Sequence, residues 1–372
     1  MNGVKTFVLV YVDDIIITGE AETQVKEVIE RLNAKFALKD MGNLHYFFRI
    51  QVTKISDGGI LLSQEKYINE VLKKANMEGC SSCHTPLSSA VKLSALSGSN
   101  FGDSQLYRSI IGSLQYLTVT RPEISYSVHK MSQFVQAPLD SHWKMVKRIL
   151  RYLSGTINHG LHLNKANSMK ITAYSDSDWV GDPDDRKSTS GCCVFLGSNL
   201  VSWASKKQTA VAKSSTKAEY RNMTDLVAEL IWVKNLMSEL QFPSKEASMV
   251  YCDNLSAVLL AANPILHSKS KHFEIDLHFV RDHVNSKDIK VSHIPGAMQV
   301  ADILTKAVSS ENFLHFRRKL NIKELDNINA TGELKSRGNN QQKQQNKCVE
   351  MMMHDDQNTT TQEEGESRGH DR

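Results

Sequence analysis

Patterns of apolar and polar residues divide the chain into regions with different predicted structure. Near the N-terminus, the apolar run of residues 7–12 leads to Asp13 and Asp14, and residues 15–19 read Ile-Ile-Ile-Thr-Gly. This pattern predicts two strands joined by a tight turn. Both arms are apolar along their length, which indicates a hairpin buried on both faces with its acidic tip presented by a rigid sheet. An ordinary solvated turn is the alternative, since Asp is common in turns.

Further elements follow before the middle of the chain. An amphipathic helix is expected over residues 22–38, and a strand, a glycine turn and a second strand over residues 45–64. Ser63 is placed to cap the next helix. The Ser-rich stretch 80–104 predicts a long loop or hinge. Two more helices are expected over 106–120 and 142–156.

The pattern changes at about residue 165, where short strands appear in succession. A long helix from about Ser214 to Leu240 follows them. Strands and helices arranged in this order predict a mixed α/β fold of modest size. The polar residues beyond about 325 are rich in Gln and Asn and predict a disordered tail. The other expected elements are strands at 170–176, 192–197, 200–205, 249–253 and 289–294, and helices at 254–263, at 272–285 and from Ala301.

Composition narrows the class of protein without naming a function. The 372 residues are 40% hydrophobic and 23% charged, which is typical of a globular protein of roughly two domains. The net charge of +4 permits a nucleic-acid partner but does not argue for one. The sequence has no recognisable secretory signal and no apolar run long enough for a membrane span, so we expect an intracellular protein without a membrane partner. It does not indicate an oligomeric state or a compartment.

The six cysteines are scattered, as expected in a reducing compartment. The pentapeptide Cys-Ser-Ser-Cys-His, residues 80–84, matches a c-type haem attachment pattern and has the spacing of a zinc pair. Zinc would need a second pair of ligands nearby, and haem attachment would need an export route. Two incidental thiols in a Ser-rich loop are therefore the better interpretation.

Four carboxylates fall at the ends of predicted elements in the region after residue 165. Asp176 closes a strand, Glu219 lies early in the long helix, Asp253 ends another strand, and Asp302 lies near the start of the last helix. Such positions can converge at one edge of an open sheet. Each residue alone is more often a cap or a solvated loop residue. Together they would repel one another unless cations lay between them, and Mg²⁺ or Mn²⁺ prefers these oxygen ligands. Two such ions can support phosphodiester cleavage.

Longer blocks of sequence make the chain similar to the polyprotein of copia-type LTR retrotransposons. The similarity runs almost continuously from Phe7 to about residue 308. It is carried by the blocks YVDD with ITG, YRSIIGSLQYLTVTRPEISYSVHKMSQF, HWKMVKRILRYLSGT, AYSDSDWVGDPDDRKSTSGCCVFLG, SWASKKQTAVAKSSTKAEY, CDNLSA, and HFVRDHV through ADILTK.

This resemblance implies the domain organisation. Residues 1–165 would be the C-terminal part of a reverse transcriptase, with palm hairpin, thumb and connection. Residues 166–325 would be a ribonuclease H-like mixed-sheet domain, and residues 326–372 the polar tail. In the family the Tyr-x-Asp-Asp turn carries polymerase metal ligands, which places that role on Asp13 and Asp14 as a polymerase remnant.

The resemblance also implies the reaction of the second domain. Asp176, Glu219, Asp253 and Asp302 would hold two Mg²⁺ or Mn²⁺ ions and cut the RNA strand of an RNA–DNA hybrid. Asp176 would bridge the two ions, Glu219 and Asp253 would hold one of them, and Asp302 the other. Asp178, two residues further along an extended strand, is the alternative to Asp176.

Basic residues suggest where the nucleic acid would bind. Two groups could contact phosphates: Arg186, Lys187 and Ser188 form one, and Lys206 and Lys207 the other. Solvated basic loops explain both groups equally well.

The histidines at 267, 272, 278 and 283 suggest a metal cluster, but helix packing or substrate contact is the better interpretation.

Departures from the family pattern limit the polymerase prediction. A reverse transcriptase of this kind supplies a further metal-binding aspartate from sequence upstream of the hairpin, so we expect polymerase activity only if that part is supplied. Arg49 stands where the family usually has glycine. The leading hypothesis is therefore a truncated reverse transcriptase and ribonuclease H fragment that is active as an RNA–DNA hybrid ribonuclease. The alternative is an inactive or co-opted remnant that binds nucleic acid without catalysis.

Overall fold

The chain forms two compact units in the computed structural model. One unit comprises residues 1–48 and 340–372, and the other residues 49–339. The residues whose structure is described are 4–12, 14–56, 58–91, 93–96, 98–165, 168–244, 246–263, 271–325 and 349–353.

In its described residues, the first unit is a small sheet with one helix. β1 and β2 form the expected antiparallel hairpin, in which Tyr11 lies opposite Asp14. The sheet order is β1-β2-β14-β3. Its elements are β1 (Thr6–Tyr11), β2 (Asp14–Gly19), α1 (Glu22–Asn33), β3 (Leu38–Asn43), β4 (Tyr46–Phe47) and β14 (Val349–Met353).

The expectation that both faces of the hairpin are buried is wrong. Ile15 and Ile17 of β2 are buried against Val25 and Ile29 of α1, whereas the β1 residues from Val8 onward are exposed, Val8 itself by 46%. The reason is that α1, the one helix among the described residues of this unit, covers one face of the sheet. An apolar run predicts a strand, but burial depends on which elements pack against it.

β14 lies within the segment that was expected to be disordered. Its backbone pairs antiparallel with β2 and with β3, so that Val349 lies opposite Ile17 and Asn43. An unpaired strand edge offers backbone donors and acceptors to any extended segment that reaches it, which accounts for the pairing. The rest of the expected tail lies outside the described residues.

The second unit begins with an antiparallel sheet and a group of helices. In this unit the strands β13, β7, β6 and β5 pair in that order. The elements are β5 (Ile50–Lys54), β6 (Ile60–Ser63), α2 (Glu65–Lys74), α3 (Ser104–Leu117), η1 (Pro122–Ile124), α4 (Ser125–Ser132), α5 (Asp140–Ser154), β7 (His159–Leu163) and β13 (Ile322–Glu324).

The same unit contains a five-stranded mixed sheet in the order β10-β9-β8-β11-β12. β9 is antiparallel to both β10 and β8, and β11 runs parallel to both β8 and β12. The predicted mixed α/β fold class is thus confirmed. The elements are β8 (Ile171–Asp178), β9 (Thr189–Leu196), β10 (Asn199–Lys207), α6 (Ser215–Glu239), β11 (Ser248–Cys252), α7 (Leu255–Ala262), α8 (Lys271–Asn285), β12 (Ile289–His293), η2 (Gly296–Met298), η3 (Val300–Leu304) and α9 (Ser310–Lys319).

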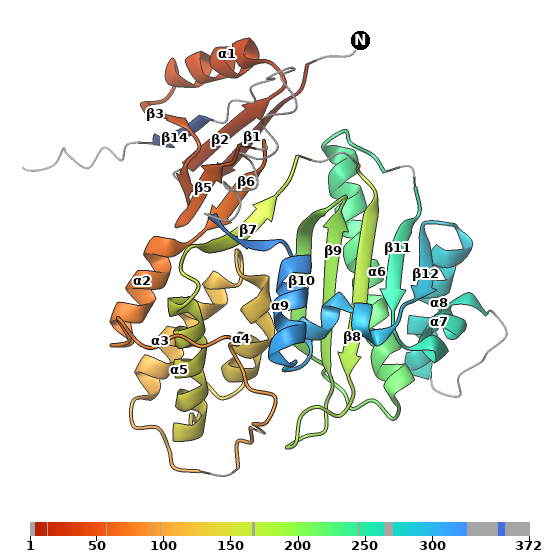
Figure 1. The fold of residues 1–372 in the computed structure, drawn as a ribbon. Coiled ribbons are helices and arrows are strands. Elements are labelled where there is room, and N and C mark those ends of the chain that lie inside the picture. The colour runs from red at the N-terminus through yellow and green to blue at the C-terminus, as the bar shows by residue number, and fades with distance from the viewer. Residues whose placement is uncertain are drawn as a thin grey trace, which may run out of the picture. The chain divides into compact units, whose positions relative to one another are not determined.

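Both faces of the mixed sheet are buried, and β9 shows how. Cys192 and Val194 point to a core that they share with α6, while Cys193 and Phe195 point to a second core. This alternation is the two-residue period of a strand. In Figure 1, α6 runs along one face of the sheet. The second core includes apolar residues of α3, α4 and α5, so these helices and the mixed sheet share one hydrophobic core. The predicted boundary at 165/166 lies within this unit.

Several predicted elements begin or end elsewhere. The expected helix from Ala301 is a short 3₁₀ helix, η3, and a separate helix, α9, starts at Ser310. Ser63 ends β6 and does not cap α2, whose N-cap is Gln64. The sequence did not predict α4 and β7. Residues 80–103 contain no helix and no extended strand among those described, as expected for a loop.

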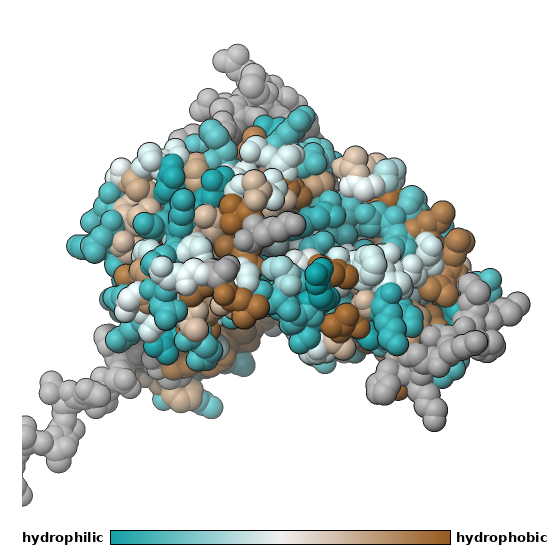
Figure 2. Space-filling view, turned by 90° about the horizontal axis from the view of Figure 1, so that it is seen from below, coloured by the Kyte–Doolittle hydropathy of each residue, from teal (hydrophilic) through white to brown (hydrophobic). Residues whose placement is uncertain are grey.

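The surface is mixed in character. Figure 2 shows hydrophilic and hydrophobic residues interspersed over the face that it presents. Singly exposed apolar side chains of this kind are normal for a globular protein. Within the described residues, the longest and most apolar helices fall short of what a membrane crossing requires.

Candidate active site

Four carboxylates come together at one edge of the mixed sheet. Asp176 is near the end of β8, and Asp253 directly follows β11, the parallel neighbour in which Cys252 lies opposite Ser175. Glu219 lies in the second turn of α6, and Asp302 in η3. Adjacent parallel strands end at the same edge, which is where open α/β sheets place their ligand sites.

The carboxylates are close enough to share cations. Oxygen atoms of Asp176, Asp253 and Asp302 all lie within 4.8 Å of one another, and so do ligand atoms of Glu219, Cys252 and Asp253. Asp176 is only 2% and Glu219 5% exposed. Buried carboxylate oxygens in a cluster fit the preference of Mg²⁺ or Mn²⁺ for hard oxygen ligands.

The raised pKa of Glu219 shows that ionising all the carboxylates of the cluster together is unfavourable. One of its oxygens accepts a hydrogen bond from the Ser177 backbone N–H at 3.1 Å, and the other lies 3.8 Å from the Cys252 thiol, which donates to it. Burial, followed by the charges of Asp176 and Asp253, raises the pKa of Glu219 to about 9. A bound cation would remove this penalty, because opposite charge favours the ionised carboxylate.

The pKa values of Asp302 and Asp253 are raised as well. Burial, then the charge of Asp176, raises the pKa of Asp302 to about 7, although Lys306 acts to lower it. The pKa of Asp253 is also raised, by burial and then by Asp176. Like charges gathered in a buried site produce such shifts, and strongly shifted groups are typical of functional sites.

Lys306 completes the site, and sequence analysis missed it. Its ammonium lies 2.9 Å from Asp302 Oδ1 and 3.6 Å from Asp176 Oδ2. Burial opposes its charge, but the carboxylates of Asp176 and Asp302 prevail and raise the pKa of Lys306. The hydroxyl of Thr305 donates a further hydrogen bond to Asp176. The signal in the sequence is the spacing of four residues between Asp302 and Lys306, which brings the two side chains together on one turn.

Neighbouring residues hold the backbone around Asp176 in place. The Asn222 amide donates to the Asp176 carbonyl oxygen at 2.7 Å and to the Gly191 carbonyl oxygen at 2.8 Å, which ties α6 to β8 and β9. A Cβ at Gly191 would lie 2.5 Å from the Thr305 side chain and 2.9 Å from that of Leu304. Glycine at this position therefore allows η3, with Asp302, to approach β9.

Asp178 lies beside this cluster and belongs to neither group of close ligand atoms among the described residues. It is at the end of β8, opposite Thr189, and is half-buried. A Cβ at Gly181 would overlap its carboxylate, so the loop after β8 packs directly on Asp178. The geometry thus favours Asp176 over Asp178 as the metal ligand on this strand.

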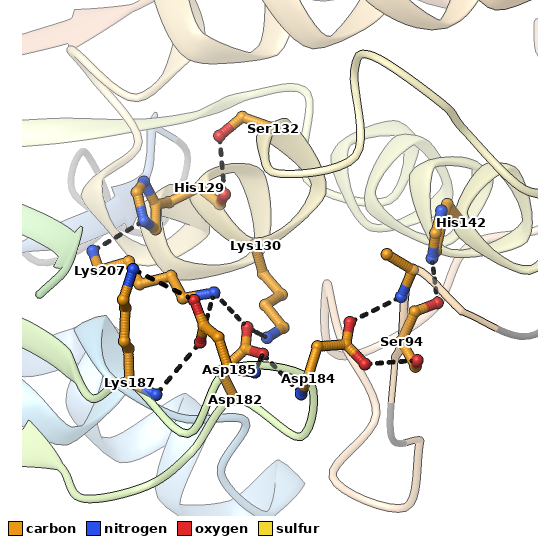
Figure 3. A network of polar contacts seen from close by, with 11 residues as sticks. Ser94, His129, Lys130, Ser132, His142, Asp182, Asp184, Asp185, Lys187 and Lys207 are labelled. Atoms are coloured by element: carbon orange, nitrogen blue, oxygen red, sulfur yellow. Dashed lines mark hydrogen bonds and ion pairs between the residues drawn. The ribbon is translucent and has the colours of Figure 1, made fainter. Parts of the chain in front are cut away.

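The basic residues predicted to contact nucleic acid differ in their surroundings. Lys207 is held by two carboxylates, with its ammonium 2.8 Å from Asp182 and 3.0 Å from Asp185. Lys187 lies 3.4 Å from Asp185, as Figure 3 shows. Ser188 is buried. Arg186 and Lys206 are exposed.

The other residues that the sequence suggested as metal ligands do not form a cluster in the described part of the chain. Asp13 lies outside the described residues. Asp14 is the first residue of β2 and belongs to no group of potential metal ligands in the described part of the chain. Cys80 and Cys83 are free thiols. His283 pairs with Asp288, their nearest atoms 3.1 Å apart, and His278 is exposed. The remaining two predicted histidines, His267 and the side chain of His272, lie outside the description.

Comparisons with known proteins agree with these features. Residues 2–89 match the model of the family described as reverse transcriptase (RNA-dependent DNA polymerase). The chain is 43% identical, over 316 residues, to the retrovirus-related Pol polyprotein from transposon RE2 of Arabidopsis thaliana. That match covers 85% of this chain but only 22% of the relative, so the chain spans about a fifth of its length.

Two further comparisons concern a shorter relative and a solved structure. A transposon Ty5-1 protein of Saccharomyces cerevisiae is 30% identical over 226 residues, covering 60% of this chain and 73% of that protein. The foamy viral protease-reverse transcriptase in complex with an RNA/DNA hybrid is 12% identical, covers 81% of this chain and 37% of that chain, and has a TM-score of 0.47. Residues 2–89 thus match the reverse transcriptase family, and the chain belongs to the Pol polyprotein family of copia-type retrotransposons.

Proposed function

We propose that the second unit is a metal-dependent ribonuclease that cuts the RNA strand of an RNA–DNA hybrid. The observation that carries the proposal is the convergence of Asp176, Asp253 and Asp302 within 4.8 Å, with Glu219 beside Asp253. Carboxylates crowded in this way at a sheet edge have a clear purpose only when cations are present. The family to which the chain belongs makes nucleic acid the expected substrate.

The residues fit a site for Mg²⁺ or Mn²⁺. Asp176, Glu219, Asp253 and Asp302 would hold the ions, which when bound would supply an activated water and stabilise the leaving oxygen of the phosphodiester. The two groups of close ligand atoms have Asp253 in common. The bridging role that we expect for Asp176 remains a prediction.

The chain's own residues position the site. Asn222 holds the Asp176 backbone, and the Ser177 N–H orients Glu219. Gly191 allows η3 to bring Asp302 to the same point. These contacts place the ligands on rigid elements, as a preorganised site requires.

Hydrolysis is proposed in preference to DNA synthesis. In the described part of the chain, Asp14 belongs to no group of three potential metal ligands, whereas Asp176, Asp253 and Asp302 form one. Polymerisation also needs two ions to align the primer and the nucleotide. The polymerase role of Asp13 and Asp14 stays a prediction from the family resemblance.

A second candidate is a protein that binds nucleic acid without cutting it. The observation in its favour is the position of Lys306, whose ammonium contacts both Asp176 and Asp302. A resident cation of this kind could neutralise the cluster and leave no role for a metal ion.

The test is cleavage of a labelled RNA–DNA hybrid by the full chain in magnesium. Asp253→Asn removes one ligand charge at nearly constant shape and is expected to lower the rate by on the order of 100-fold or more, since even outer-shell partners of a metal contribute 10–100-fold. Asp282→Asn makes the same change at an exposed position on α8 and serves as the control. Equal rates in wild type and Asp253→Asn would contradict the proposal. Hybrid binding without turnover would support the second candidate.

A further inference from the structure

A cavity of about 300 Å³ opens directly beside the carboxylate site. One wall is formed by Leu87, Ser88, Ser89, Val91 and Leu93 with Tyr126 of α4, and another by the loop after β8 with Arg186. Asp178 and Lys306 line the cavity as well. Its volume falls at the lower end of the range of small-molecule sites, roughly 300–1,000 Å³.

The cavity adjoins the carboxylate cluster at Lys306, with Asp178 close by on the strand of Asp176. Lys306 lines it and also contacts Asp176 and Asp302. Asp178 lies two residues after Asp176 on the same strand. A strand whose phosphate sits at the carboxylates would therefore pass the neighbouring nucleotide into this cavity.

Its walls are held together by a buried ionic network. The ammonium of Lys130, on α4, donates to Asp182 Oδ2 at 2.9 Å, and that of Lys207 donates to the same oxygen at 2.8 Å. Figure 3 shows the two lysines converging on Asp182. Although burial works against it, these two hydrogen bonds hold the pKa of Asp182 well below its usual range, so the carboxylate stays charged.

Two further hydrogen bonds tie the loop after β8 to Ser94 and Ala95. The Ser94 hydroxyl donates to Asp184 at 2.5 Å and the Ala95 N–H donates at 2.7 Å. The loop after β8 is thus tied at both Asp182 and Asp184 to parts of the chain that precede residue 165. Preformed walls reduce the ordering cost of binding.

The charges of the cavity match a ribonucleotide better than a bare phosphate. Arg186 is exposed, and its acidic neighbour Asp185 is occupied by Lys187 and Lys207, so the guanidinium is available for a phosphate. Asp178 is a carboxylate that would repel a phosphate but can accept a hydrogen bond from a sugar hydroxyl. A site for phosphate alone would carry basic groups without this acid.

We propose that this cavity binds one ribonucleotide of the RNA strand next to the phosphate that is cut, with Arg186 on its phosphate and Asp178 on its ribose hydroxyl. The inference rests on the proposed function and gives the cavity-lining residues between Leu87 and Ser89, and α4, a part in substrate recognition. The 2′-hydroxyl, which would donate this hydrogen bond to Asp178, is the group that distinguishes RNA from DNA.

The test is equilibrium binding, so that it does not depend on turnover. Anisotropy of a labelled hybrid is titrated with the full chain in calcium, and intact RNA is verified after each titration. Arg186→Gln is expected to weaken hybrid binding about tenfold, as the loss of one charge-assisted contact does. Ser89→Phe, which fills the cavity from its wall, is expected to do the same. Lys170→Gln, an equal charge change at an exposed position before β8, should change binding less than about twofold.

A second comparison tests the ribose contact. The ratio of the affinity for hybrid to the affinity for a DNA duplex of the same sequence is measured in the wild type and in Asp178→Ala. The ratio is expected to be about threefold to tenfold lower in the variant, because one hydrogen bond is lost. Equal losses in Arg186→Gln and Lys170→Gln, unaltered binding by Ser89→Phe, or an unchanged preference in Asp178→Ala would overturn the inference. A wild type that binds with these sensitivities but cuts no RNA in magnesium would instead contradict the proposed function alone.

Discussion

Without metal, the carboxylate cluster should make the second unit less stable as the pH rises, and Glu219 should account for much of this loss. Burial and the charges of Asp176 and Asp253 raise the pKa of Glu219 from 4.5 to about 9. The folded state therefore binds the proton more tightly than the unfolded state. Stability contributed by the protonated group is fully present below about pH 4.5 and is lost as the pH rises toward 9.

The magnitude follows from the same shift. One pKa unit corresponds to 1.36 kcal/mol, so raising the pH from about 5 to about 8 should cost at most about 4 kcal/mol of unfolding free energy. Glu219→Gln cannot ionise and should lack this contribution, so that only the smaller pH dependence from Asp302 and Asp253 remains. Glu239→Gln, an exposed position at the end of the same helix, serves as the control and should behave like the wild type.

Urea denaturation followed by tryptophan fluorescence measures this directly. All four tryptophans, at 143, 179, 203 and 232, lie in the second unit, so the signal reports that unit. In EDTA the wild type should lose stability between the two pH values, and millimolar magnesium should restore most of the loss at the higher pH. If Glu219→Gln and the wild type show the same pH dependence, or magnesium has no effect, the reasoning is refuted.

Four other predictions concern single features. Arg121→Met should cost about 3–5 kcal/mol in urea denaturation, because it leaves the fully buried Glu123 without the guanidinium that now lies 2.7 Å away; a loss below 1 kcal/mol would be inconsistent with that role. Gly191→Ala should lower hybrid cleavage at least about tenfold while hybrid binding persists, since its Cβ would push η3 away; wild-type rates would show that this close approach is unimportant. Lys306→Met should lower the magnesium concentration for half-maximal cleavage several-fold, because a competing cation is removed; an unchanged or higher requirement would argue against competition. Residues 166–325 alone should show no cooperative urea transition, because one face of their sheet is buried by helices from the preceding part; a sharp transition would disprove this dependence.

Much of the second unit could be predicted from local patterns. The strands β8, β9 and β10 and the long helix α6 were expected within a few residues of where they lie, because alternation and helical spacing are local signals. Family resemblance then selected Asp176, Glu219, Asp253 and Asp302, and the structure brings all four to one sheet edge. Their roles remain predictions.

Other features depend on tertiary contacts that no local pattern reveals. The apolar strand β1 predicted burial, yet Val8 is exposed, because burial depends on a covering element. Lys306 was missed because its importance lies in its proximity to Asp176, which is 130 positions away in the sequence. The cavity beside Asp178 depends on the distant pairing of Lys130 with Asp182.

The central claim is that the four carboxylates hold divalent cations for cutting RNA. The most direct measurement places the full chain with an end-labelled RNA–DNA hybrid and with a DNA duplex of the same sequence, each in magnesium and in EDTA. We predict that the RNA strand is cut in magnesium only and that the DNA duplex remains intact. Hybrid that is bound in magnesium but stays uncut would contradict the account.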